Sequence, residues 1–167
     1  MVIIETERLT LSELSIKDAP FVFELYNDPD FLKYIGDRGV GSIADAKKFI
    51  ETGPKASYVL HGHGLYLIQI KDGTSIGICG LLKRDTLDAP DIGFSVLPNY
   101  RKNGYAFEAA KAVIHNGKIR LGLKQIVAIT NPDNKISIRL LEKLSMLFNQ
   151  KIHFKTLDEG DHLYTII

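Results

Sequence analysis

Six consecutive residues, 101–106, have the composition of a turn that could hold a phosphate group: Arg-Lys-Asn-Gly-Tyr-Ala. They lie between an apolar run and an alanine-rich segment, so a helix is expected to begin directly after Gly104. The first turn of a helix has unpartnered backbone N–H groups and a partial positive charge, which together bind anions. Gly104 and Ala106 leave room for a ligand, and Arg101 and Lys102 add positive charge. The alternative is an ordinary surface turn, and these six residues alone do not decide between the two.

Two common phosphate-binding motifs are excluded by the surrounding sequence. A Walker A loop would continue with Gly-Lys-Ser or Gly-Lys-Thr, which does not follow here. A dinucleotide-binding turn would have Gly-x-Gly-x-x-Gly inside a strand–helix–strand unit, and this chain has neither. A phosphate site at this turn would therefore belong to another class.

The composition and charge of the chain are those of an ordinary soluble globular protein. Of its 167 residues, 45% are hydrophobic and 25% are charged, and the net charge is +1. A charge so close to zero gives no indication of nucleic acid or of an anionic membrane, so neither is expected as a partner. Any basic site must be local.

The single cysteine and the N-terminal sequence bear on where the protein is found. One cysteine, Cys79, cannot form an internal disulfide, which fits a reducing compartment. The N-terminal stretch MVIIETERLTL has no long apolar core, unlike a signal peptide. No apolar run approaches the roughly 20 residues of a membrane span. We therefore expect a cytoplasmic protein.

The order of the predicted helices and strands indicates a mixed α/β (α+β) fold in one domain, residues 1–167, since no repeat or linker interrupts the chain. It is not a run of strand–helix–strand units, so a doubly wound sheet is not expected. The patterns predict, in order, a strand in 1–14; a helix after Ser15 that stops at Asn27-Asp28-Pro29; a helix from Ser42 that ends at Gly53-Pro54; strands 65–70, 75–83 and 92–97; a helix from Tyr105 to about Arg120; a strand 124–130; a helix from Asp133 or Asn134; and strands 149–156 and 162–167 around a turn at 158–161.

Placed on these elements, the turn resembles a known motif. Arg101-x-x-Gly104-x-Ala106 matches the Gln/Arg-x-x-Gly-x-Gly/Ala motif of the GCN5-related N-acetyltransferases (GNAT), where it follows the fourth strand and opens the third helix. Three further segments resemble the RimJ/RimL-like branch, which modifies the N-termini of ribosomal proteins. They are Glu5-Thr6-Glu7-Arg8-Leu9-Thr10-Leu11, Asp91-Ile92-Gly93-Phe94, and Asn131 to Leu144 with its Asn134, Ser137 and Leu-Leu-Glu-Lys-Leu pattern. The resemblance covers nearly the whole chain in the right order.

The resemblance implies the GNAT fold and acetyl-CoA as co-substrate. That fold is a mixed, mostly antiparallel sheet of about seven strands with helices on both faces, and its fourth and fifth strands splay apart to hold acetyl-CoA. The unpaired backbone of the fourth strand would pair with the amide-containing pantetheine arm. The expected cofactor-binding residues are Phe94, Ser95 and Val96 on that strand; Arg101, Lys102, Asn103, Gly104, Tyr105 and Ala106 at the pyrophosphate; and Asn134 and Ser137 on the later helix. Asn134 could equally be a helix N-cap, and Ser137 a small packing residue.

The resemblance also implies direct attack of an amine on the thioester. A carboxylate can take the proton of the amine, and Asp91 is the candidate base, although it could equally be a charge at the edge of a strand. Many family members protonate the CoA thiolate with a tyrosine, but that position is Leu141 here, which leaves Ser137 as the candidate donor. A second departure is Leu144-Ser145-Met146, where the family usually has Leu-Gly-Phe.

The acceptor is expected to be a primary amine, most simply a protein or peptide N-terminus. A model α-amino group has a pKa of about 7.7–8.0 and lysine about 10.4, so an α-amine needs less help to react. The alternatives are a small-molecule amine (a polyamine, an amino sugar or an antibiotic) and a non-catalytic module that only binds acetyl-CoA. The protein is expected to be a monomer or homodimer. No metal is expected, because His61 and His63 are read as part of a loop, and Cys79 is read as a core residue.

Overall fold

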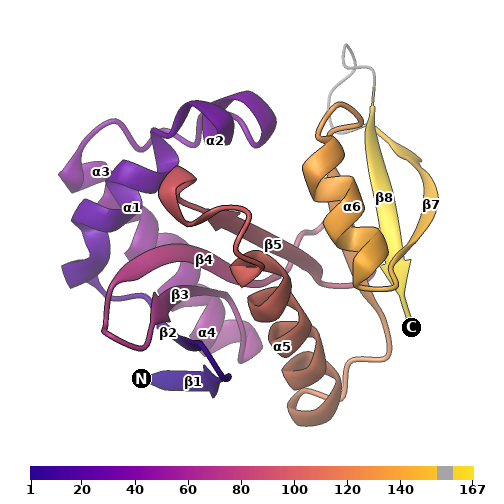
Figure 1. Cartoon of the computed structure of the whole chain (residues 1–167), viewed down its shortest axis with the longest axis horizontal. Helices are drawn as coiled ribbons and strands as arrows, with labels where there is room; N and C mark the ends of the chain where they lie inside the picture. The colour runs from indigo at the N-terminus through magenta and orange to yellow at the C-terminus, as the bar shows by residue number, and fades with distance from the viewer. Residues whose placement is uncertain (154–159) are drawn as a thin grey trace.

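A computed structural model describes residues 1–153 and 160–167, and within them eight strands form one sheet (Figure 1). The strand order is β1-β2-β3-β4-β5-β6-β8-β7, and every neighbouring pair is antiparallel except β5 and β6. The strands are β1 (Val2–Glu5), β2 (Leu9–Glu13), β3 (Leu65–Ile70), β4 (Ser75–Leu82), β5 (Asp91–Val96), β6 (Ile126–Thr130), β7 (Leu147–Ile152) and β8 (Asp161–Ile166). The mixed sheet is confirmed, with one strand more than expected.

The additional strand arises at the N-terminus, where the single strand predicted in 1–14 was wrong. The chain turns back at residues 6–8, so β1 and β2 form a hairpin. The Thr6 N–H donates to the Leu9 carbonyl at 2.9 Å, and the Leu9 N–H donates to Thr6 Oγ1 at 3.0 Å. On β2, Leu9 and Leu11 point into the core and are fully buried. The turn is missed by a period-2 reading because it contains neither glycine nor proline.

The helices are α1 (Ala19–Tyr26), α2 (Pro29–Tyr34), α3 (Ile43–Ile50), α4 (Ala56–His61), α5 (Tyr105–Arg120) and α6 (Lys135–Lys143). Of the two expected helix ends, the first was confirmed and the second was wrong. Asn27-Asp28-Pro29 does end α1, but it also starts α2, because Pro29 suits a first helical position and Asp28 accepts the Phe31 N–H at 3.1 Å. Gly53-Pro54 does not end the helical region, because a wide, π-type turn at Glu51–Lys55 takes up the proline and leads into α4.

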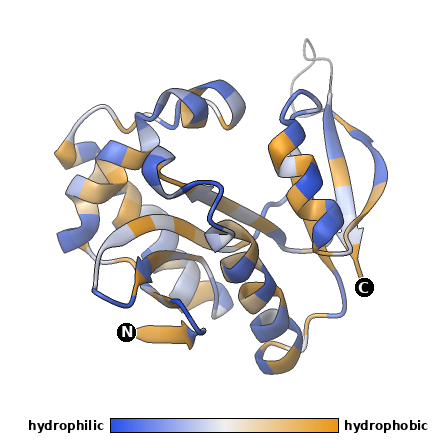
Figure 2. Cartoon of the chain, in the orientation of Figure 1, coloured by the Kyte–Doolittle hydropathy of each residue, from blue (hydrophilic) through white to orange (hydrophobic). Residues whose placement is uncertain are grey.

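Helices cover both faces of the sheet, as expected, and a separate hydrophobic core lies on each face (Figures 1 and 2). On one face α5 packs through Ala109, Ala110 and Val113 against side chains that include Ile68. On the other face α1 and α3 pack against Leu65, Leu67 and Ile78. Adjacent residues of β3 thus point to opposite faces, as strand geometry requires. On β5, Ile92 and Val96 belong to the core on the α5 side.

The strands β5 and β6 separate almost as soon as they pair. Their register contains one pair, Asp91 with Val127, and the Val127 N–H donates to the Pro90 carbonyl at 3.0 Å. Beyond this point β5 continues along β4 for its whole length, with no strand paired to its β6 side among the residues that the structure describes. The expected splay is therefore confirmed, and it starts at Asp91.

The C-terminal strands agree with the prediction as far as they can be followed. The last strand, β8, lies between β6 and β7. The predicted end of the preceding strand at Thr156 and the first half of the predicted turn at 158–161 lie outside the described residues. Within the described residues, no helix is long and apolar enough to cross a membrane.

Candidate active site

The turn between β5 and α5 presents backbone donors at the open end of the splay. It comprises a short 3-10 turn at Pro98–Tyr100, then residues 101–104, after which α5 begins at Tyr105. Gly104 has φ 78° and Lys102 has φ 64°, a left-handed conformation that non-glycine residues rarely adopt. Within the described chain no side chain caps the first turn of α5, so the N–H groups of residues 105–107 point out of the helix end. Alternating left- and right-handed residues direct successive N–H groups into one concavity, which suits an anion.

The side chain of Arg101 is bonded to other residues of the protein. Its guanidinium donates to the Val96 carbonyl at 2.8 Å, to Asp28 at 2.6 Å and to Asp30. Its own N–H donates to the Pro98 carbonyl at 3.2 Å. Two carboxylates thus neutralise the charge of Arg101, and its side chain fastens the turn to β5 and α2. Of the two cations expected at the turn, only Lys102 is exposed.

The backbone of β5 offers donors and acceptors along the splay. Successive residues of a strand direct their backbone groups to opposite edges. The Pro90 and Val96 carbonyls accept hydrogen bonds on the β6 side. Ile92 and Phe94 lie at alternate positions between them, so their backbone N–H and C=O groups point to that side as well. By the same alternation the backbone groups of Ser95 face its β4 partner Ile78, and the Val96 carbonyl is already bonded to Arg101. The Ile92 N–H completes the parallel pairing with Val127. The edge available to a ligand is therefore formed by the Ile92 carbonyl, Phe94 and the Val96 N–H.

Asp91 lies at the point where β5 and β6 separate. It is the first residue of β5 and is only 3% exposed, so its carboxylate is a buried charge at the end of the strand. The Arg84 guanidinium donates to Asp91 Oδ1 at 2.9 Å. Burial raises the pKa of Asp91 above its ordinary value, and the charges of Arg84 and Arg38 partly offset this rise. A buried carboxylate with a raised pKa is a stronger base than an exposed one, which suits proton abstraction.

Helix α6 brings two of the expected residues to one end of the same region. Asn134 Oδ1 accepts the Ser137 N–H at 3.1 Å, so Asn134 does cap α6. Ser137 is half-buried, whereas Leu141 is 1% exposed inside the main core. The Lys143 ammonium lies 4.4 Å from the centre of the Phe107 ring, which places α6 against the first turn of α5. The position of the usual tyrosine therefore holds a core residue.

The second departure on α6 leaves the helix end intact. Ser145 has φ 63° and takes the left-handed position that glycine usually fills after a helix. The Ser145 N–H donates to the Glu142 carbonyl at 2.9 Å, and the Met146 N–H donates to the Leu141 carbonyl at 3.0 Å. These two bonds form a Schellman motif, so the helix ends as it would with glycine.

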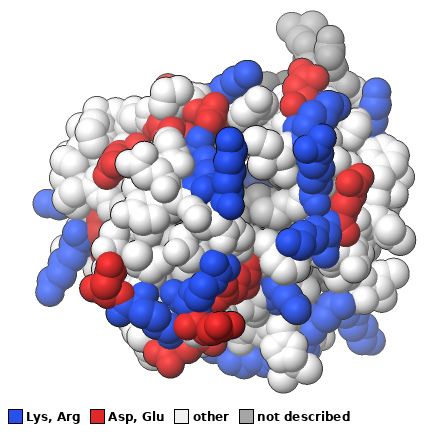
Figure 3. Space-filling model, in the orientation of Figure 1, with Lys and Arg blue, Asp and Glu red and all other residues white. Residues whose placement is uncertain are grey.

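Positive charge gathers on both sides of a hollow on this face of the molecule (Figure 3). Lys102 is exposed on the turn, and Lys135, Arg139 and Lys143 are exposed along α6 at four-residue spacing, hence on one side of the helix. The protein as a whole has a charge of only +1, so the basic character is local. This arrangement suits a ligand with several phosphates.

The two histidines considered as metal ligands and the single cysteine lie outside the splay between β5 and β6. His61 is the last residue of α4, so its placement in a loop was wrong. His63 does lie in the connection between α4 and β3, where it is buried with its Nδ1 3.0 Å from the Leu81 carbonyl. Burial lowers the pKa of His63. Cys79 is fully buried in β4, and its role in the core is confirmed. Among residues 1–153 and 160–167, no group of three or more His, Cys, Asp or Glu side chains could hold a metal ion.

Comparison with known proteins assigns the family. The acetyltransferase (GNAT) domain family matches residues 8–146. An uncharacterized N-acetyltransferase of Bacillus subtilis (strain 168), YnaD, is 32% identical over 143 residues, covering 86% of this chain and 81% of YnaD. A solved GNAT-family acetyltransferase from Bacillus anthracis is 27% identical, with a TM-score of 0.81 over 100% of this chain and 98% of that one.

A further solved structure shows the same fold at lower identity. It is RimL, a ribosomal α-N-protein acetyltransferase in complex with coenzyme A, with a TM-score of 0.86 and 16% identity over 100% of this chain and 98% of that one. At this identity the likeness concerns the fold alone. The match over residues 8–146, together with the N-acetyltransferase relatives, shows that the chain belongs to the GNAT family of acetyltransferases and is an N-acetyltransferase.

Proposed function

We propose that the protein transfers the acetyl group of acetyl-CoA to a primary amine by direct attack, and that residues 1–167 form one such domain. The observation that carries the proposal is the separation of β5 and β6, which leads from the buried Asp91 to the uncapped turn before α5. The pantetheine arm would pair with the Ile92 carbonyl, Phe94 and the Val96 N–H. The pyrophosphate would accept hydrogen bonds from the N–H groups of residues 102–107.

The second side of the cofactor site is formed by α6. Asn134 caps the helix through its Oδ1, which leaves its Nδ2 as the group to meet the cofactor. The half-buried Ser137 hydroxyl lies one turn further along the same helix. Lys102 on the turn and Arg139 and Lys143 on α6 would balance the phosphate charges. The role proposed for Arg101 is to hold the turn, not to bind phosphate through its side chain.

The reaction needs one proton removed and one supplied. The amine nitrogen forms a bond to the acetyl carbon as the carbon–sulfur bond breaks, and the sulfur leaves with the electron pair. Asp91 would take the amine proton through a water molecule, since it is short and buried at the apex of the splay. Arg84 helps to keep the carboxylate ionised. With Leu141 in the core, Ser137 is the donor proposed for the thiolate.

The charges around the site favour an N-terminal α-amine over a polyamine. A polyamine needs carboxylates that are free to bind several ammonium groups. Asp28 and Asp30 are both paired with Arg101, and Asp91 is paired with Arg84. An α-amine has one charge to lose and a pKa of about 7.7–8.0, so a single buried carboxylate is sufficient. An acceptor with an acidic group near its amine would also benefit from Arg84.

A release assay for free thiol tests the proposal. Acetyl-CoA is offered with N-terminal peptides, polyamines and aminoglycosides in turn, and release is expected to depend on the peptide amine. Release with polyamines alone would overturn the acceptor assignment and keep the transferase. Thermal stabilisation by CoA without release for any amine would indicate a binding module instead. Ligand at one hundred times Kd should stabilise the fold by about 2.7 kcal/mol.

A further inference from the structure

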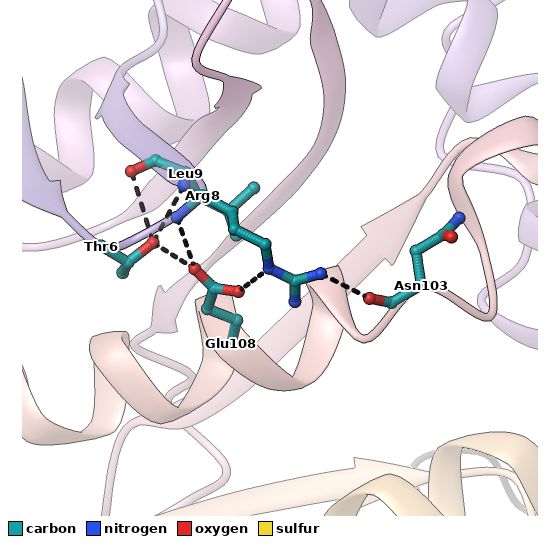
Figure 4. Close-up of polar contacts among 5 residues, drawn as sticks. All are labelled: Thr6, Arg8, Leu9, Asn103 and Glu108. Carbon is teal, nitrogen blue, oxygen red and sulfur yellow. Dashed lines mark hydrogen bonds and ion pairs between the residues drawn. The ribbon is translucent and has the colours of Figure 1, made fainter.

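The turn between β1 and β2 is joined to the start of α5 by a network that neither packing nor the proposed chemistry requires (Figure 4). Glu108, in the first turn of α5, accepts the Thr6 hydroxyl at 2.6 Å and the Arg8 N–H at 3.0 Å. Its second oxygen accepts Arg8 Nε at 2.6 Å. Burial alone would raise the pKa of Glu108, but the bonds from Thr6 and Arg8 outweigh this and lower it. Glu108 is therefore ionised at neutral pH, and it fixes the direction of the Arg8 side chain.

Held in this way, Arg8 reaches the turn that precedes α5. Its Nη1 donates to the Asn103 carbonyl at 2.9 Å, and its guanidinium carbon lies 4.7 Å from the centre of the Tyr105 ring. Its Nη2 lies 3.4 Å from the position that a Cβ on Gly104 would occupy. Arg8 thus contacts Asn103 and Tyr105, on either side of Gly104, although it is 95 residues distant from Asn103 in the sequence.

The turn needs such support because its conformation is not a favoured one. Lys102 is left-handed without being glycine, and residues 102–104 are exposed. Arg101 ties the turn to Asp28 on one side, and Arg8 ties it to Glu108 on the other. A carbonyl held by Arg8 cannot rotate into the concavity, so the neighbouring N–H groups keep their direction.

We propose that Arg8, fixed by Glu108 and Thr6, is a positioning residue that holds the 102–106 turn in the form that binds the CoA pyrophosphate. The inference rests on the proposed function. It gives a role to the Thr6-Glu7-Arg8-Leu9 segment, whose chemistry is otherwise unused. When only a fraction of the free protein has the competent turn, the apparent Kd rises by the inverse of that fraction.

The test measures the Kd for CoA by titration calorimetry in the full-length protein and in Arg8→Gln and Glu108→Gln. A turn that is competent about a tenth of the time weakens binding about tenfold, and this is expected for both variants. Arg120→Gln is the matched control, because it removes an arginine on α5 that bonds to the Gly62 carbonyl, far from the turn. Its Kd should equal that of the wild type.

Glu108→Gln separates positioning from direct phosphate binding. It keeps the Arg8 charge and removes only the anchor, so a direct contact predicts unchanged or tighter CoA binding, which would overturn the proposal. Equal Kd values for Arg8→Gln and wild type would also overturn it. Failure of the wild type itself to bind CoA would instead overturn the proposed function. The KM for acetyl-CoA should rise more than kcat falls, and Arg8→Lys should recover part of the loss, which a loss of folded protein alone would not produce.

Discussion

Replacing Gly104 by alanine should weaken CoA binding, because Gly104 has φ 78° at the point where the turn becomes a helix. A left-handed conformation costs a non-glycine residue roughly 1–2 kcal/mol. Alanine also lowers the entropy of the unfolded chain, which stabilises the folded state by about 0.4–1 kcal/mol. The net loss of stability is therefore expected to be about 1 kcal/mol. The new Cβ would lie 3.4 Å from Arg8 Nη2, so it has room but disturbs the contact that holds the turn.

The effect on binding can exceed the effect on stability. If the turn escapes the strain by leaving its left-handed form, binding must restore that form at a cost of roughly 1–2 kcal/mol, which is about 5- to 30-fold in Kd. Titration calorimetry with CoA measures this change. Pantetheine, which has no pyrophosphate, should bind the variant and the wild type equally. The matched control is Gly73→Ala in the β3–β4 turn, where φ is 91° and the new Cβ would have no contact within 4 Å.

The comparison of the two glycine variants decides the outcome. Gly73→Ala should lose a similar amount of stability and keep its affinity for CoA. If Gly104→Ala bound CoA as tightly as Gly73→Ala does, the turn would not be the pyrophosphate site. An equal loss of pantetheine binding would also refute the reasoning, since it would place the damage along β5.

Three further predictions follow from the site and its surroundings. Because the pKa of Asp91 is raised, kcat/KM should fall as the pH drops through a value above the ordinary 3.8, and Asp91→Asn should remove that dependence. If the pH–rate profile of the variant equalled that of the wild type, Asp91 would be excluded as the base. Arg84→Gln removes a charge that lowers this pKa, so the acid limb should move to higher pH, and a shift to lower pH would contradict the assignment. Ser145→Gly relieves a left-handed serine and should raise Tm by up to about 2–4 °C, equivalent to about 1 kcal/mol, with CoA affinity unchanged; a lower Tm in a thermal melt would show that Ser145 is not strained.

The same rise in the pKa of Asp91 affects folding. The folded state binds this proton more tightly than the unfolded chain does, so stability falls as pH rises from the ordinary value of 3.8 through the raised one. Asp91 therefore makes the fold less stable at neutral pH. This is the behaviour of a group kept for reactivity and not for stability.

Much of the fold could be predicted because the signals are local and repeated. The helix at 105–120 has alanines at helical spacing and a glycine before it, and α5 begins and ends as expected. The hairpin of β1 and β2 could not be predicted, since its turn depends on a Thr6 side chain that bonds to Leu9. The helix end predicted at Gly53-Pro54 was wrong because a π-type turn accommodates a proline that would break an ordinary helix.

The site was only partly predictable because charges find their partners through the fold. Nothing near Arg101 in the sequence indicates that Asp28 and Asp30 will neutralise it. Arg84 is seven residues from Asp91, yet only the pairing of β4 with β5 brings the two together. Arg8 and Glu108 are 100 residues apart, and the one available signal was the resemblance of the segment that contains Arg8.

The most direct test of the central claim is the mass of an acceptor peptide after incubation with the protein and acetyl-CoA. A peptide with a free α-amine and one internal lysine should gain one acetyl group at its α-amine, with one thiol released for each group transferred. The same peptide with a blocked N-terminus should remain unmodified. Thiol release without any acetylated peptide, or acetylation of the lysine alone, would contradict the account.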